Sequence, residues 1–138
     1  MEVLFRNVRE LVEKAEKENK LISEIMIEQE ILITERTREE IMSQMDRNLT
    51  VMEEAVEKGL KGVRSTSGLT GGDAVLLQAY MKKGNSLSGE LMLDAVSKAV
   101  ATNEVNAAMG TICATPTAGS AGVVPGTLFA VKNKLNPT

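Results

Sequence analysis

Residues 111–126, with the sequence TICATPTAGSAGVVPG, join two segments that have the pattern of apolar helices. The stretch contains two prolines, three glycines and four hydroxyl side chains. Proline restricts the backbone and removes an N–H donor, whereas glycine accepts positive φ angles and lets a ligand approach the main chain. A turn of this kind offers amides and hydroxyls to a carboxylate group. A plain helix connector is the structural alternative.

The composition of the 138 residues indicates one domain. Aromatic residues make up 2% of the chain and tryptophan is absent, so the core must be built from aliphatic side chains and methionine. A net charge of −3 gives no basic surface for nucleic acid. No apolar run reaches the roughly 18 residues that a membrane span requires. The first residues lack the apolar core of a signal peptide, so we expect a cytoplasmic protein.

The chain contains one cysteine and no histidine. Its own residues therefore cannot assemble a Ser–His–Asp triad, a Cys–His pair, or a metal site of histidines or several cysteines. Cys113, which lies in the turn, is expected to be a small buried hydrophobe. Catalytic groups of these kinds must come from elsewhere.

Apolar residues at three- and four-residue spacing predict an all-α protein of about five to six helices. The first helix is expected over residues 2–20. The second is expected over residues 21–33, where Ser23 is the candidate cap. This second segment is rich in isoleucine, which leaves a strand as an alternative there.

The third helix has the clearest signals. Thr37 and Glu40 have the spacing of a capping box, in which each side chain accepts a hydrogen bond from the other residue's backbone N–H. Apolar residues then follow in steps of three or four up to Leu60. Gly59 or Gly62 is expected to end this helix in the left-handed conformation.

Loops rich in glycine or proline are predicted before the fourth and the last helices. The first of these loops covers residues 62–73 and leads into a helix over 74–81, with Asp73 at its cap or in its first turn. A longer helix is then expected over 90–109. Ser86 or Ser88 is the candidate cap of that helix.

The last helix is expected from about Pro125 to Leu135, with Pro125 near the first helical position because its missing N–H costs little there. Gly110 is expected to end the helix before it. Composition divides the chain into an amphipathic part over residues 1–61 and a more apolar, glycine-punctuated part over 62–138.

Two polar regions are open to more than one interpretation. The sequence SGLTGGD at residues 67–73 lacks the lysine of a Walker phosphate loop, and no strand is evident before it. Anion binding at the next helix N-terminus and a simple linker both fit this loop. Asn103, Glu104 and Asn106 form either a polar patch facing the 111–126 turn or an ordinary solvent-facing surface.

Three ordered stretches resemble one family, namely SGLTGGDA at residues 67–74, ATNEVNAAMG at 101–110 and PTAGSAGVVP at 116–125. They are similar to motifs in the α chain of the bacterial iron–sulfur-dependent L-serine dehydratase of the two-subunit type. The resemblance extends essentially from Leu4 to Thr138. It implies a mostly helical catalytic domain that converts L-serine to pyruvate and ammonia by elimination of water. It also implies a separate β chain and an oxygen-sensitive 4Fe-4S cluster in place of pyridoxal phosphate.

The chain departs from the family pattern in length. By the resemblance, family α chains are about twice as long, and the cysteines that hold the cluster belong to later motifs that this chain does not contain. Cys113 matches none of those motifs. We therefore expect the N-terminal part of the catalytic chain, with the cluster cysteines beyond Thr138. We expect neither cofactor nor activity in this part alone.

The resemblance implies that the two loops, together with the segment between them, bind the substrate. Uncharged donors there would fix the substrate carboxylate, and the strongest candidates are Ser67, Thr70, Thr117, Gly119 and Ser120. The general base is left unassigned. The full set of predicted substrate-binding residues is Ser67, Gly68, Thr70, Gly71, Gly72, Asp73, Asn103, Asn106, Pro116, Thr117, Ala118, Gly119 and Ser120.

A non-catalytic helical interaction module, or a fragment that serves subunit assembly, is the alternative function. Its methionine-rich faces would dock on a partner protein. A nucleotide-binding domain is a weaker alternative because the Walker lysine is missing. The expected partners are L-serine and the β chain, without nucleic acid or membrane, and a homo-oligomer is left open.

Overall fold

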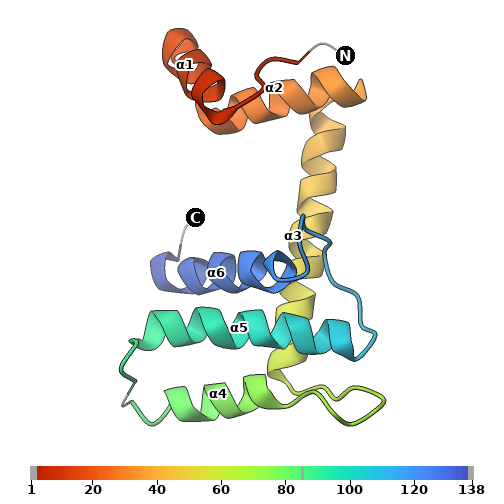
Figure 1. The fold of residues 1–138 in the computed structure, drawn as a ribbon, viewed down its shortest axis with the longest axis vertical. Helices are drawn as coiled ribbons and strands as arrows, with labels where there is room; N and C mark the ends of the chain where they lie inside the picture. Colours follow the sequence, from red (N-terminus) through yellow and green to blue (C-terminus); the bar gives the residue numbers. More distant parts are fainter. Residues whose placement is uncertain (1–2, 85, 137–138) are drawn as a thin grey trace. The chain divides into compact units, whose positions relative to one another are not determined.

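The computed structural model describes residues 3–84 and 86–136, which form six helices and no strand (Figure 1). The all-α prediction is therefore confirmed. Contacts between residues group the chain into two compact units, Met1–Arg47 and Asn48–Thr138. The helices are α1 (Val8–Glu18), α2 (Ile22–Thr34), α3 (Arg38–Leu60), α4 (Asp73–Met81), α5 (Glu90–Ala107) and α6 (Ser120–Leu135).

In the first unit, α1 begins later than the expected residue 2, because Asn7 caps it. The Asn7 side chain accepts a hydrogen bond from the Glu10 N–H at 3.0 Å. Glu2 itself lies outside the described residues. Asn19, in the left-handed conformation at φ 49°, ends the helix.

The α2 segment is helical, so a strand there is excluded. Its cap residue is Leu21, which makes no side-chain cap bond, and the prediction that Ser23 caps this helix is therefore wrong. The helix already includes Ser23 because it starts at Ile22. Gln29 is buried and accepts a hydrogen bond from the Leu4 N–H at 2.6 Å, which holds the leading segment against α2.

The capping box before α3 is confirmed. The Thr37 N–H donates to Glu40 Oε2 at 2.8 Å, and the Glu40 N–H donates to Thr37 Oγ1 at 3.2 Å. Of the two glycines proposed to end the helix, Gly62 takes the left-handed conformation at φ 96°. Gly59 lies inside α3.

In the second unit, α5 lies between α4 and α6, and both neighbours run antiparallel to it (Figure 1). The N-termini of α4 and α6 therefore lie at the same end of this three-helix layer, beside the C-terminus of α5. Helix N-termini carry partial positive charge and free amide groups. Two of them thus lie at one end of the layer, with the C-terminus of α5 between them.

Glycines allow direct contact between helix backbones in this unit. A Cβ atom on Gly122 would lie 2.7 Å from the Ala99 carbonyl oxygen, and one on Gly126 would lie 2.7 Å from that of Ala95. A Cβ on Gly59 of α3 would lie 2.2 Å from the carbonyl oxygen of Ala101. Side chains larger than hydrogen do not fit at these distances, so α5 meets both α6 and α3 at close range.

The prediction that the last helix begins near Pro125 is wrong, since α6 begins at Ser120 and Pro125 is buried inside it. An interior proline removes one helical hydrogen bond. The helix nevertheless continues through it, because Gly122 and Gly126 on either side press the backbone against α5. Tertiary contact outweighs the local preference of proline for a helix start.

The start of α5 at Glu90 agrees with the prediction, but the residues predicted to cap and to end this helix are wrong. Gly89, at φ 81°, precedes the helix without a side-chain cap bond, while the Ser86 and Ser88 hydroxyls lie 3.2 Å apart and bond to each other. At the other end the left-handed residue is Met109, at φ 61°, and not Gly110. Gly110 is needed for space, because a Cβ there would lie 2.6 Å from the Val105 side chain.

Among the described residues, no helix has both the length and the apolar character required to cross a membrane.

Enlarging Gly126 should separate α5 from α6. We expect Gly126→Val to lower the free energy of unfolding by about 1–3 kcal/mol, because the added side chain meets backbone atoms that cannot rotate away. Urea denaturation followed by circular dichroism measures this change. Gly119→Ala is the control, since a Cβ there meets no atom within 4 Å. Equal losses of stability in the two variants would contradict the role of backbone contact.

The capping box should respond to pH. Hydrogen bonds from Thr37 hold the pKa of the Glu40 carboxyl below its ordinary value of 4.5, the backbone N–H having the largest effect. Because the pKa is lowered in the folded protein, this stabilisation is complete above pH 4.5 and is lost as the pH falls through the lowered value. Glu40→Gln should flatten that part of the stability–pH curve, whereas Glu39→Gln, which removes no cap bond, should not. Thr37→Ala should raise the Glu40 pKa, and an unchanged value in a carboxyl NMR titration would rule out the Thr37 side-chain contribution.

Candidate functional site

The predicted site residues lie at the end of the α4–α5–α6 layer that holds the N-termini of α4 and α6 (Figure 1). The two N-termini lie on opposite sides of α5, and α4 and α6 do not contact each other among the described residues. The loop over residues 61–72 leads into α4, and the segment over 108–119 leads into α6. The last turns of α5, which carry Asn103 and Asn106, lie between these two entries. Two loops separated in sequence by the 35 residues of 73–107 are therefore brought to one end of a single layer.

The loop before α4 is held by short-range hydrogen bonds. The Ser65 N–H donates to the Thr70 carbonyl oxygen at 2.9 Å, and the Thr70 N–H donates to Ser65 Oγ at 3.2 Å. Ser67 Oγ lies 3.1 Å from Ser65 Oγ. Both Ser67 and Thr70 are exposed to solvent. The loop therefore presents polar side chains outward from a small closed turn.

The glycines of this loop have distinct roles. Gly68, Gly71 and Gly72 all have positive φ angles, of 73°, 119° and 97°. A Cβ on Gly71 would also lie 2.1 Å from the Val63 carbonyl oxygen, so the main chain at Gly71 is in direct contact with the main chain at Val63. At Gly72, by contrast, an added Cβ meets no atom within 4 Å. Open space therefore adjoins the residue directly before α4.

The hydroxyls before α6 form a cap. Ser120 Oγ accepts a hydrogen bond from the Thr117 N–H at 3.0 Å, and Thr117 Oγ1 accepts one from the Ser120 N–H at 3.1 Å. The Ser120 hydroxyl also lies 2.6 Å from Thr115 Oγ1. Two side chains predicted to contact substrate are thus already bonded to each other and to the backbone.

Other groups of this turn stay accessible. Pro116, Thr117, Ala118 and Gly119 are exposed. Within the part of the chain that the structure describes, the N–H groups of Ala118 and Gly119 make no hydrogen bond. These two amides precede the N-terminus of α6, so they are free to bind an anion.

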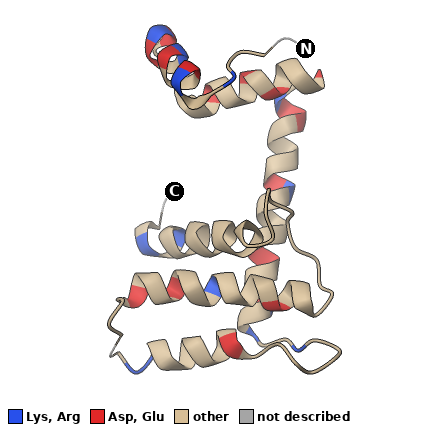
Figure 2. Cartoon of the chain, viewed as in Figure 1, with Lys and Arg blue, Asp and Glu red and all other residues tan. Residues whose placement is uncertain are grey.

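The polar residues of α5 divide between the two neighbouring helices. Asn103 is exposed, and its amide lies against α6, because a Cβ on Gly122 would be 2.9 Å from both Asn103 Oδ1 and Nδ2. Asn106 is also exposed. Glu104 turns the other way and is only 6% exposed, and its Oε1 accepts a hydrogen bond from the Asp73 N–H at 2.6 Å. The Asp73 side chain itself is exposed, and Figure 2 shows acidic positions at the start of α4 and toward the end of α5.

Glu104 was not among the predicted site residues. Its second carboxylate oxygen, Oε2, is buried and has no hydrogen-bond partner among the described residues. One signal in the sequence could have singled it out. An acidic residue in the last turn of a helix is unfavourable, because it lies next to the negative end of the helix dipole. A glutamate at this position therefore indicates a specific interaction that offsets this cost.

The residues present do not fit a 4Fe-4S cluster. Such clusters are bound by several cysteine thiolates, and this chain has one cysteine. Cys113 is half-buried, more accessible than the buried hydrophobe that was expected, and its Sγ lies 3.7 Å from the Ala114 carbonyl oxygen. Among the described residues, no three His, Cys, Asp or Glu side chains gather as metal ligands would.

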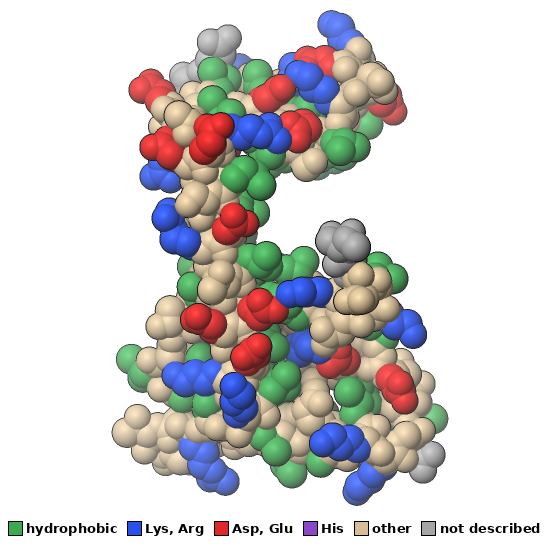
Figure 3. All heavy atoms as spheres, turned by 180° about the vertical axis from the view of Figure 1, so that it is seen from behind, with side chains coloured by type: hydrophobic (Ala, Val, Ile, Leu, Met, Phe, Trp, Pro, Cys, Tyr) green, Lys and Arg blue, Asp and Glu red, His purple; other side chains and the backbone are tan. Residues whose placement is uncertain are grey.

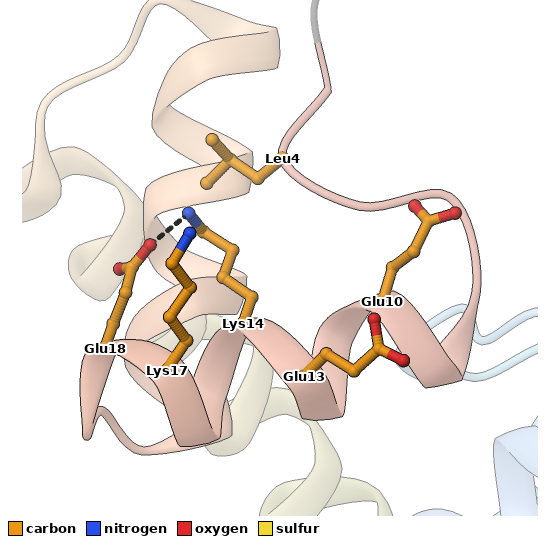
Figure 4. Close-up of a pocket in the computed structure, with 6 residues that line it drawn as sticks. All are labelled: Leu4, Glu10, Glu13, Lys14, Lys17 and Glu18. Carbon is orange, nitrogen blue, oxygen red and sulfur yellow. Dashed lines mark hydrogen bonds and ion pairs between the residues drawn. The ribbon is translucent and has the colours of Figure 1, made fainter.

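Two shallow hollows lie away from these loops. One, of about 320 Å³, lies along α1 in the first unit and is lined mainly by charged side chains, including the Lys14–Glu18 ion pair (Figure 4). Hydrogen bonds from Lys14 and Lys20 lower the pKa of Glu18. The other hollow, of about 220 Å³, lies at the opposite end of the three-helix layer. Neither contains a residue of the three sequence motifs.

Comparison with known proteins identifies relatives of this chain. The family model described as "Serine dehydratase alpha chain" matches residues 17–138. The "Probable L-serine dehydratase, alpha chain" of Bacillus subtilis (strain 168) is 73% identical over 135 residues, which are 98% of this chain and 45% of the relative. The "L-serine dehydratase, alpha chain" of Peptoniphilus asaccharolyticus is 33% identical over 134 residues, which are 96% of this chain and 46% of that relative.

This chain therefore spans about half the length of these two relatives. No solved structure matches it significantly. The match covers the two loops and α5, which are the segments that carried the resemblance in the sequence. The extent of the family match and the identity to the Bacillus relative show that this chain belongs to the serine dehydratase α-chain family.

Proposed function

We propose that this chain forms part of an L-serine dehydratase, which removes water from L-serine and yields pyruvate and ammonia. Its role in that enzyme is to bind the carboxylate of the substrate. The observation that carries the proposal is the position of two motif loops and two helix N-termini at one end of the α4–α5–α6 layer, on either side of the C-terminus of α5 (Figure 1). The names of the relatives support the choice of substrate and reaction.

The turn before α6 supplies the donors for the carboxylate. A carboxylate binds well at a helix N-terminus because free amides point at it and the helix dipole favours negative charge. The amides of Ala118 and Gly119 are positioned for this, and the exposed Thr117 hydroxyl lies beside them. That hydroxyl donates to Ser120 Oγ at 3.0 Å in this structure, and in this proposal it turns to the carboxylate when the substrate binds. Ser120 acts indirectly, because its hydroxyl fixes the turn through its bonds to Thr117 and Thr115.

The loop before α4 completes the site from the other side. Ser67 and Thr70 add exposed hydroxyls, and the glycine backbone near Gly72 leaves room for a small ligand. The Asp73 carboxylate carries the same charge as the substrate carboxylate. It is therefore suited to a donor group of the substrate, such as its ammonium or hydroxyl, and not to the carboxylate.

The rest of the enzyme lies outside residues 1–138 in this proposal. The 4Fe-4S cluster of the family needs cysteine ligands that this chain does not have, so we place them in a later segment of the complete α chain. A β chain completes the enzyme, which we place in the cytoplasm. Residues 1–138 alone are then inactive. The general base is not assigned to any residue of this chain.

A protein-interaction module is the second candidate, and the outer face of α6 favours it. Val124, Leu128 and Val131 lie three or four residues apart on this helix and are each 41–46% exposed. Figure 3 shows further hydrophobic side chains on the surface among charged ones. An uncovered apolar stripe on a surface helix is typical of a protein contact.

The first test of the proposed function is a chimera. Residues 1–138 replace the matching stretch of the Bacillus subtilis relative, and the product is expressed with the β chain of that enzyme. We expect the chimera to form pyruvate from L-serine. Thr117→Val should then raise the KM for L-serine about tenfold or more, because a hydrogen bond to a charged carboxylate is lost.

Two further variants control for the cap. Thr117→Ser keeps the hydroxyl and should restore the parental KM, whereas Thr111→Val, in the same segment but outside the motifs, should leave it unchanged. A Thr117→Val chimera that folds and keeps the parental KM would contradict carboxylate binding by this turn. In that case the interaction module would be the better description.

A further inference from the structure

Glu104 of α5 is a buried carboxylate with one unused oxygen. The side chain is 6% exposed, and Oε1 accepts the Asp73 N–H at 2.6 Å. Oε2 is also shielded from solvent, and no described residue donates a hydrogen bond to it. Burying a hydrogen-bond acceptor without a donor is unfavourable, and native proteins rarely leave such a group unpaired. The position of Oε2 therefore calls for a donor that this chain does not supply.

A positive helix end lies next to Glu104. The N-terminus of α4 carries partial positive charge and already donates one amide to Glu104. A carboxylate oxygen accepts hydrogen bonds, so the missing group is a donor.

A small cation fits this position better than a metal ion. Divalent cations such as Mg²⁺ and Ca²⁺ take about six or more oxygen ligands. No cluster of acidic, cysteine or histidine side chains suitable for a metal is found among the described residues. A primary ammonium group carries three N–H donors and needs only a few acceptors. The exposed Asp73 carboxylate, next to the amide that binds Glu104, adds to the attraction for a cation.

We propose that Glu104 Oε2 accepts a hydrogen bond from the α-ammonium group of the amino-acid substrate. The inference rests on the proposed function, in which the amides before α6 and the loop before α4 hold the carboxylate of the same molecule. Glu104 then selects α-amino acids over 2-hydroxy acids of the same shape. A 2-hydroxyl group can also donate to Oε2, but the charged ammonium group makes the stronger hydrogen bond, and this difference sets the selection.

Glu104→Gln in the chimera tests the inference. Glutamine has the same shape, and its amide oxygen still accepts the Asp73 N–H. Its NH₂ group, however, puts a donor where Oε2 offered an acceptor. We expect the KM for L-serine to rise about tenfold or more, while the inhibition constant of glycerate changes much less, because its hydroxyl can donate to the glutamate or accept from the glutamine NH₂ group.

Glu90→Gln is the matched control, because Glu90 is an exposed glutamate at the other end of the same helix. It should change neither constant. A Glu104→Gln chimera with the parental KM for L-serine would overturn the inference and leave the proposed function intact. Equal weakening of L-serine and glycerate would also overturn it, because the effect would not depend on the ammonium group.

A second measurement decides the inference if the chimera makes no pyruvate or the variant does not fold. The ¹⁵N-labelled 138-residue chain is titrated with methylammonium, and the amide resonance of Asp73 is followed. A saturable shift, absent with tetramethylammonium of equal ionic strength because that ion has no N–H donor, supports an ammonium site at Glu104. No shift overturns the inference. The proposed function fails separately, if the folded chimera binds neither L-serine nor glycerate.

Discussion

Direct contact between helix backbones is the constraint on which the second unit depends. Gly122 and Gly126 of α6 lie against carbonyl oxygens of α5, and Gly59 of α3 does the same from another side. The chain has few aromatic residues with which to fill wide gaps between helices. Close approach solves this problem, because short separations let small side chains pack at the density of a protein interior. The alanines of α5 contribute to the same close approach, because their side chains are small.

The closeness of α5 and α6 also explains the position of the candidate site. With α4 and α6 both antiparallel to α5, the positive ends of two helices lie on either side of the C-terminal end of the third (Figure 1). Such a place attracts negative charge. The Asp73 amide already donates to Glu104, whereas the amides of Ala118 and Gly119 before α6 remain free. The same end of the layer thus holds one built-in carboxylate and has room for the carboxylate of a ligand.

The hydroxyl side chains of this site already make hydrogen bonds that stabilise the fold. The Thr117–Ser120 pair repeats the reciprocal logic of the Thr37–Glu40 capping box, with a serine in place of the glutamate. Ser65 ties its loop together in a similar way. A cluster of serine, threonine and glycine in a sequence is therefore ambiguous. The same groups that would contact a substrate are the groups that fix a turn, and only the hydrogen bonds in the structure distinguish the two.

The sequence by itself determined the features that depend on neighbouring residues. The Thr37–Glu40 box, the left-handed Gly62 and the start of α4 at Asp73 are local, because the partners lie within a few residues of each other. The three motifs likewise indicated the family and the two loops. Only the tertiary structure decided that α6 runs through Pro125 and that Glu104 meets α4. Those outcomes depend on the contact of α6 with α5 and on an amide thirty-one residues away, and such distant partners leave no periodic signal in the chain.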